Sequence, residues 1–274
     1  QELTEAGPWL AFDVRNPAAL EGAVTEHQID AIMHLASLLS AVAETQPQQA
    51  WDVNVNGLIN ALEAARRHRC ALFFPSSIAA FGPATPPERT PQVTVQRPTA
   101  IYGITKVTGE LLCDYYHARY GVDARGLRYP GIVSAKTLPG GGTTDYAVHI
   151  FRAALKERRY ECFLAADTRL DLMYMPDAVR AAIELMEADG AKLAHRNAYN
   201  VTAMSVTPQE LADAIACRLP GFTISYRVDP VRQAIADSWP RSLDDSAARA
   251  EWGWRPAYDL EAMVDEMLRT LSSG

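Results

Sequence analysis

Short apolar runs alternate with longer amphipathic stretches through the first half of the chain. The apolar runs, each bounded by turn residues, are 9–12, 31–36, 71–74 and 124–128. Helical periodicity occupies 50–67 and the segment from about Tyr102 to Tyr120, where Gly121 can end the helix. Strands that alternate with helices form parallel sheets, because a parallel pair of strands needs a crossover connection. The pattern predicts an α/β fold with a Rossmann-like, doubly wound parallel sheet.

The regular alternation weakens behind residue 130. A glycine-rich loop at 139–144 precedes a helix that we expect over 146–156. Further helices are expected at 176–187, 208–219, 244–254 and 260–271, with an alternating run at 222–227. We therefore expect residues 1–130 to form a dinucleotide-binding domain. Residues 131–274 should form mainly a smaller α/β substrate-binding part that is interleaved with the first.

The glycine-rich turn that normally begins a dinucleotide-binding sheet is not found before Asp13. Such a turn joins the first strand to a helix whose N-terminus holds the pyrophosphate. The cluster Gly140 to Gly142 lies late and does not follow a strand that begins a βαβ unit. We therefore expect the first βαβ element to lie outside this sequence, so that residues 1–130 are an N-terminally incomplete domain. A fold without that element is the alternative.

Charge and composition narrow the classes of partner. The net charge is −7 and no basic stripe is present, which argues against nucleic acid. No stretch reaches the roughly 18 to 20 apolar residues of a membrane span. The four cysteines lie far apart, without metal-type spacing, at 70, 113, 162 and 217. We expect a cytoplasmic protein that binds small molecules, without a metal site.

Tyr102 and Lys106 lie four residues apart on a predicted helix and therefore share one face. A phenol with its ordinary pKa of ~10 is a poor base at neutral pH. A neighbouring ammonium stabilises the phenolate, so the pair can exchange a proton with a substrate hydroxyl. An ordinary surface pair at this spacing is the alternative for an isolated YxxxK.

The serines that follow the strand at 71–74 favour the catalytic interpretation. Ser76 and Ser77 come just after the strand, at the edge of an open α/β sheet where ligands bind. A serine there can hydrogen-bond a reacting oxygen and orient it for proton transfer. His34, which also follows a strand, is better explained as a structural residue.

This order of motifs resembles the extended short-chain dehydrogenases/reductases, the NAD-dependent epimerase/dehydratase family. The resembling segments are DVRN at 13–16, HLAS at 34–37, NVNG at 54–57, SS at 76–77, YGITK at 102–106 and RYPGI at 128–132. The resemblance implies NAD as the cofactor and Ser77, Tyr102 and Lys106 as the catalytic residues. It also implies a homodimer built on the helices that hold Asn54 and Tyr102. The implied cofactor contacts are Asp13, Val14, Leu35, Ala36, Asn54, Tyr102, Lys106, Tyr129, Pro130 and Ile132.

Within the family, PGGGTTDYA at 139–147 and RQAIADSWP at 232–240 resemble the short-chain-type L-threonine 3-dehydrogenases. These enzymes oxidise the 3-hydroxyl of L-threonine to 2-amino-3-oxobutanoate, with hydride transfer to NAD. The resemblance implies substrate contacts at Ser37, Ser76, Gly141, Thr143 and Trp239. For Trp239, a core or interface aromatic is the favoured alternative. A sugar-nucleotide epimerase or dehydratase, and a catalytically inactive scaffold of the same fold, remain the alternatives.

Overall fold

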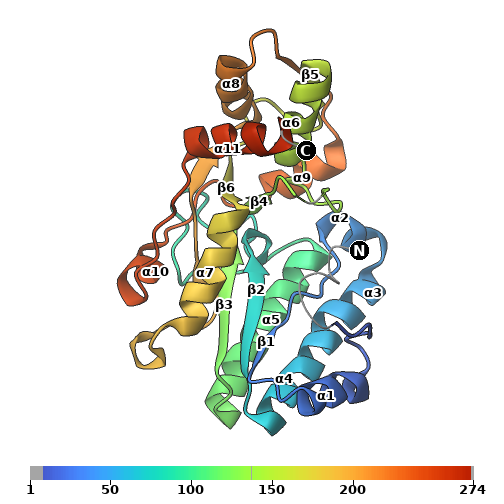
Figure 1. The fold of residues 1–274 in the computed structure, drawn as a ribbon, viewed down its shortest axis with the longest axis vertical. Coiled ribbons are helices and arrows are strands. Elements are labelled where there is room, and N and C mark those ends of the chain that lie inside the picture. The colour runs from blue at the N-terminus through green and yellow to red at the C-terminus, as the bar shows by residue number, and fades with distance from the viewer. Residues whose placement is uncertain (1–8, 137, 273–274) are drawn as a thin grey trace.

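A four-stranded parallel sheet supports one part of the molecule (Figure 1). The computed structural model describes residues 9–136 and 138–272. The sheet order is β1-β2-β3-β7, with bounds Ala31–Met33, Ala71–Ser77, Ala124–Tyr129 and Tyr199–Asn200. All three pairings are parallel. The prediction of an α/β, Rossmann-like fold is confirmed.

Helices cover both faces of this sheet, as the alternation of side chains along β2 requires. Leu72 and Phe74 of β2 pack in a cluster with α1 (Pro17–Glu26), α4 (Gly57–His68) and α5 (Ile101–Tyr120). Phe73 points to the other face, where it packs with α7 (Met175–Glu187) and α10 (Ser246–Glu251). Figure 1 shows α1, α4 and α5 on one side of the strands and α7 on the other. The sheet is thus doubly wound.

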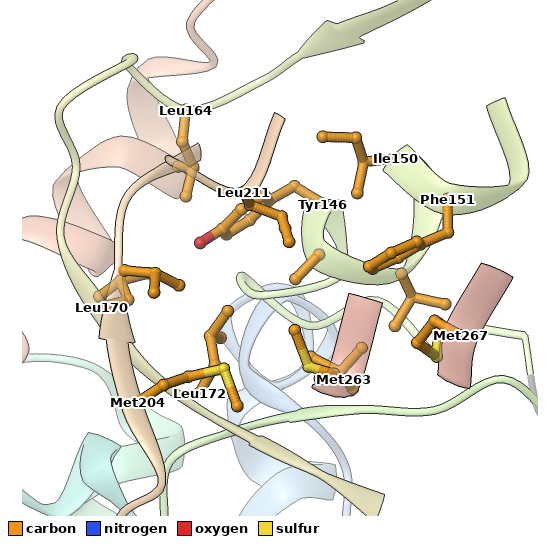
Figure 2. Packing of buried hydrophobic residues seen from close by; sticks show 14 of the residues in the cluster. Tyr146, Ile150, Phe151, Leu164, Leu170, Leu172, Met204, Leu211, Met263 and Met267 are labelled. Carbon is orange, nitrogen blue, oxygen red and sulfur yellow. The ribbon is translucent and has the colours of Figure 1, made fainter. Parts of the chain in front are cut away.

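A second part of the molecule has its own sheets and core. Its strands are β4 (Gly131–Val133), β5 (Arg159–Cys162), β6 (Leu170–Tyr174), β8 (Met204–Val206) and β9 (Thr223–Tyr226). They form a β4-β6-β8 sheet and a β5-β9 pair. The helices are α6 (Tyr146–Glu157), α8 (Pro208–Arg218), α9 (Pro230–Asp237) and α11 (Leu260–Ser272). Figure 2 shows Tyr146 and Phe151 of α6 packed among Leu172, Met263 and other apolar residues of this core.

Shorter elements complete the described chain. They are α2 (Ser40–Thr45), α3 (Pro47–Trp51), a π-helical turn η2 (Asp52–Asn56) that continues into α4, and two 3₁₀ turns, η3 (Ile78–Ala80) and η4 (Gly190–Lys192). Strand β7 and helices α7 and α10 follow residue 130 in the sequence, but they belong to or pack on the first sheet. The C-terminal half therefore contributes to both parts of the molecule.

Two local expectations were wrong. Residues 9–12 form no strand, and Trp9 and Leu10 are 58% and 55% exposed, because β1 pairs only with β2 among the described residues. Strand β2 does not stop at Pro75 but continues to Ser77. In a parallel ladder, Pro75 removes only one donor, and the strand keeps its register with β3 through Ser77 and Tyr129.

None of the described helices is both long enough and apolar enough to cross a membrane. All four cysteines are free.

Candidate active site

Strand β2 delivers Ser77 to the carboxyl edge of the sheet. Ser77 is the last residue of the strand and the N-cap of η3, where its hydroxyl accepts a hydrogen bond from the Ala79 amide at 3.2 Å. A serine is a preferred residue at such a cap because its oxygen satisfies a free backbone donor. The cap fixes the direction in which the chain leaves the sheet, and with it the position of the Ser77 side chain.

Two glycines let helix α5 pack directly against this edge. A Cβ atom at Gly103 would lie 2.1 Å from the Ala79 carbonyl oxygen, and one at Gly109 would lie 2.3 Å from Cζ of Phe74. Any side chain at these positions would push α5 away from β2 and η3. Gly121, with φ +69°, ends the helix as expected. This close contact places the first two turns of α5 beside Ser77.

Ser77, Tyr102 and Lys106 meet at this contact. The Ser77 hydroxyl hydrogen-bonds the Tyr102 phenol. Lys106 Nζ donates to the Pro75 carbonyl oxygen at 2.8 Å and lies 5.3 Å from the centroid of the Tyr102 ring. Two of the three Nζ donors have no hydrogen-bond partner among the described residues.

Burial dominates the acid–base properties of the pair. It raises the pKa of Tyr102 to about 12, and the hydrogen bond with Ser77 opposes this rise. Burial lowers the pKa of Lys106 to about 8, and the Glu110 carboxylate opposes that shift. The pKa of Tyr102 therefore does not fall below its ordinary value in this arrangement, although Lys106 lies beside the ring. Around neutral pH, Tyr102 is a phenol and Lys106 an ammonium.

The three side chains line a cavity of about 290 Å³. Its opposite wall is formed by the glycine-rich loop and by Trp239, which follows α9 and is 9% exposed. In the loop, the amides of Gly141 and Gly142 donate to Asp145 Oδ2 at 2.8 and 2.7 Å. Thr143 is buried, and its hydroxyl lies 3.4 Å from that of Ser40 in α2.

Most of the predicted site residues lie on the walls of this one cavity. They are Leu35, Ser37, Ser76, Ser77, Tyr102, Lys106, Tyr129, Pro130, Ile132, Thr143 and Trp239. Gly141 supports the loop instead, with φ +95° and its bond to Asp145. The Ser76 hydroxyl donates its hydrogen bond to the Glu110 carboxylate. Its proton is therefore not available to a substrate.

The remaining predicted cofactor contacts lie beside the cavity. Val14, Leu35 and Ala36 line a second hollow of about 350 Å³ along β1, and Leu35 belongs to the walls of both hollows. Asp13 lies outside it, in a 2.6 Å ion pair with Arg15. Asn54 is buried. Its side-chain oxygen accepts a hydrogen bond from the Leu38 backbone amide, and its side-chain nitrogen donates one to the Leu38 carbonyl oxygen. It positions the backbone that leads from β1 into α2.

These features fit a dinucleotide. An apolar hollow suits a base, and Leu35 lies both on its wall and on the wall of the cavity that holds Lys106. The unused Nζ donors of Lys106 can bind ribose hydroxyls there. His34, at the end of β1, has a buried Nε2 atom without a partner among the described residues. Burial and the nearby Lys106 lower its pKa to about 4, so His34 is neutral near pH 7.

Ser40, Asp145 and Glu110 were not among the site residues predicted from the sequence. Two had a local signal. Asp145 follows three glycines closely enough for its carboxylate to accept hydrogen bonds from the amides of Gly141 and Gly142. Glu110 lies one helical turn beyond Lys106. No local pattern could have indicated Ser40, because its hydroxyl contacts that of Thr143, which lies 103 residues further along the chain.

Comparison with known proteins agrees with this architecture. Residues 2–202 match the model of the family described as "NAD dependent epimerase/dehydratase family". The chain belongs to this family of enzymes, which confirms both the predicted resemblance and NAD as its cofactor.

Similar proteins point further within the family. The chain is 55% identical over 262 residues to an uncharacterized epimerase/dehydratase of Staphylococcus saprophyticus, covering 96% of this chain and 82% of that protein. The L-threonine dehydrogenase of Clostridium difficile superposes with a TM-score of 0.97 at 54% identity, covering 99% of this chain and 85% of that one. A monomeric L-threonine 3-dehydrogenase from a metagenome gives a TM-score of 0.93 at 46% identity, covering 96% and 84%.

Proposed function

We propose that this protein oxidises the 3-hydroxyl of L-threonine to 2-amino-3-oxobutanoate, with NAD as the hydride acceptor. The observation that carries the proposal is the single small cavity on which Ser77, Tyr102 and Lys106 converge. Ligand pockets commonly measure about 300 to 1,000 Å³. A cavity of about 290 Å³ suits a small amino acid better than a nucleoside diphosphate sugar. The similarity to solved threonine dehydrogenases supports the same substrate.

Each residue has a definite task in this reaction. Ser77 holds the substrate hydroxyl beside Tyr102, and Tyr102, as phenolate, accepts the hydroxyl proton. Lys106 stabilises that phenolate through its charge and holds the nicotinamide ribose with its free donors. NAD, held at its ribose by Lys106, would supply the acceptor for the hydride from C3 of threonine. Thr143 and Trp239 shape the opposite wall, where they exclude water and orient the amino acid.

The cofactor is proposed to lie along the hollow beside β1, against Val14, Leu35 and Ala36. Tyr129, Pro130 and Ile132 then flank the nicotinamide in the cavity. We also propose the division of the chain at residue 130. The first part supplies the catalytic residues, and the second supplies Thr143 and Trp239. The free cysteines suit the proposed cytoplasmic location.

A homodimer built on the helices that hold Asn54 and Tyr102 is part of the proposal, and α5 is the helix that carries Tyr102. Ile104, Leu111 and Tyr115 share the outer face of α5 and are 39%, 62% and 52% exposed. Such an apolar stripe is typical of a covered surface. Because one similar enzyme is monomeric, light scattering of the parent chain and of Leu111→Asp decides this point. A parent of monomer mass would contradict the dimer.

The direct test of function is NADH formation, followed by absorbance, with L-threonine as substrate. L-serine and UDP-glucose are the controls, because serine lacks the C4 methyl group and UDP-glucose represents the sugar nucleotides. Turnover with L-threonine, and much weaker turnover with both controls, is the expected result. Turnover of UDP-glucose alone would replace the proposal with sugar-nucleotide chemistry. A folded chain that binds NAD but turns over none of these substrates would favour an inactive scaffold.

A further inference from the structure

Glu110 is a buried carboxylate on the catalytic face of helix α5. It lies four residues beyond Lys106 and eight beyond Tyr102, so the three side chains share one face of the helix. Glu110 is 3% exposed and does not belong to the walls of the candidate cavity. A buried carboxylate is costly unless it is paired and hydrogen-bonded, so its surroundings need an explanation.

Four hydrogen bonds hold this carboxylate. Oε1 accepts from the Ser76 hydroxyl and from Arg128 Nε, the latter at 2.9 Å. Oε2 accepts from Arg128 Nη2 at 2.8 Å and from Gln96 Nε2 at 2.7 Å. The Arg128 pair is bidentate, and both partners are almost completely buried. The set of donors suits an ionised carboxylate, which accepts at both oxygens.

The contacts of Glu110 reach the backbone that carries the catalytic serine. Ser76 lies between Pro75, whose carbonyl accepts from Lys106, and Ser77, which hydrogen-bonds Tyr102. Helix α5 is thus tied to the end of β2 at three successive residues. Glu110 holds the middle one, which fixes the distance between the strand that bears Ser77 and the helix that bears Tyr102.

The charge of Glu110 also acts on Lys106. Burial lowers the pKa of Lys106 to about 8, and the Glu110 carboxylate raises it against that effect. Without this negative charge, the Lys106 ammonium would lose its proton closer to neutral pH. A neutral Lys106 could no longer stabilise a phenolate at Tyr102.

The other ionisable groups around Lys106 do not replace Glu110. His34 faces Lys106 from the end of β1 and is neutral near pH 7, because its pKa is lowered to about 4. Tyr102 is a phenol there, since burial raises its pKa to about 12. Arg128, on β3, is the cation that pairs with Glu110. Asp114 lies a turn further along α5 and hydrogen-bonds Asn197.

We propose that Glu110 is a positioning residue for the reaction at Tyr102: it keeps Lys106 charged and holds the end of β2 against α5. The inference rests on the proposed function, since the reaction is the one described above. Glu110 acts only through Lys106 and Ser76. A purely structural ion pair with Arg128 would support folding but would leave the titration of Lys106 unchanged.

The charge of Lys106 can be measured without turnover. The chain has four lysines, at 106, 136, 156 and 192, so selective ¹³Cε-lysine labelling gives four NMR signals to titrate. Lys106→Met assigns the signal of interest. In Glu110→Gln we expect the Lys106 midpoint to fall by about one pH unit. The matched variant Glu110→Asp keeps the charge and should stay much closer to the parent value. An unchanged midpoint in Glu110→Gln overturns the proposal.

Enzyme kinetics test the consequence for the reaction. In Glu110→Gln, kcat should fall more than KM for L-threonine changes, and the flattening of the pH profile should begin at a lower pH. Glu110→Asp should restore the pH profile. A uniform loss of activity with the parent pH profile would leave Glu110 a merely structural residue and overturn the inference. If the parent chain does not oxidise L-threonine, the proposed function fails, whereas the NMR titration still decides the role of Glu110.

Glu110→Gln leaves Arg128 buried without its partner, which can prevent folding. In that case Glu110→Gln/Arg128→Met removes the ion pair as a unit, a change that proteins often tolerate. We again expect the Lys106 midpoint to fall, because the Glu110 carboxylate shares the helix face of Lys106 and is the charged group that raises the pKa of Lys106. A parent-like midpoint in the folded double variant contradicts the proposal.

Discussion

The two walls of the candidate cavity are held in different ways. The sheet-side wall carries Ser77, Tyr102 and Lys106, and its support is a buried network that includes the Glu110–Arg128 ion pair. The loop-side wall carries Thr143. Its loop is held by two hydrogen bonds from backbone amides to the Asp145 carboxylate, and the Thr143 hydroxyl makes one long hydrogen bond with Ser40. A dense polar network fixes chemical groups closely, whereas a short glycine loop fixes mainly shape.

This difference predicts where substitutions act. Changes in the sheet-side wall should lower kcat, because they remove the groups that we propose to move a proton. Changes in the loop-side wall should raise KM, because they alter the fit of the substrate.

Tyr102→Phe should lower kcat/KM by about a thousandfold, since it removes the group that accepts the proton. The ring and its packing remain, so the thermal unfolding midpoint should stay close to that of the parent. Steady-state NADH formation and circular dichroism measure the two quantities. A variant that keeps more than a tenth of the parent kcat/KM would remove Tyr102 from the chemistry.

The pH dependence of kcat/KM reports on the same wall. Because burial raises the pKa of Tyr102 to about 12, the phenolate fraction is small at neutral pH and grows about tenfold per pH unit. We expect kcat/KM to rise between pH 6.5 and 7.5 and to flatten above about 8. The flattening follows from the pKa of Lys106, about 8, above which the ammonium is lost. A rate that falls across the lower range would contradict this assignment of base and cation.

Gly141→Ala tests the shape of the loop-side wall. Gly141 has φ +95°, a conformation that costs an alanine about 1 to 3 kcal/mol. The loop should shift to relieve this strain, so KM for L-threonine should rise about fivefold or more while kcat changes less. Gly140→Ala is the matched control, because Gly140 has no such φ and its Cβ would meet only Leu39 Cδ1, at 3.3 Å. Equal effects of the two variants would mean that backbone strain is not the cause.

Thr143→Val should have the smallest effect. It keeps the shape of a buried side chain but removes its hydroxyl, at a cost of about one hydrogen bond, 0.5 to 1.5 kcal/mol. KM should rise by a factor of about two to ten with kcat nearly unchanged. Thr143→Ser keeps the hydroxyl and should bind L-threonine more like the parent. A large loss of kcat in Thr143→Val would instead place the hydroxyl in the chemical step.

Local patterns in the sequence predicted the sheet-side wall well. The alternation of apolar runs and amphipathic stretches predicted the parallel sheet, and the spacing of Tyr102 and Lys106 put both on one face of α5. Gly121 correctly marked the end of that helix. These features depend on residues a few positions apart, for which helix and strand geometry leaves little choice.

Only the tertiary structure decided which distant residues meet. In the folded chain, Thr143 and Trp239 line the cavity that also holds Tyr102. The Ser76 hydroxyl hydrogen-bonds Glu110, and residues 9–12 lie outside any strand. An apolar run becomes a strand only where a neighbouring strand satisfies its backbone donors and acceptors. A side chain likewise acquires its chemical role from groups that packing brings beside it, across separations that local periodicity does not encode.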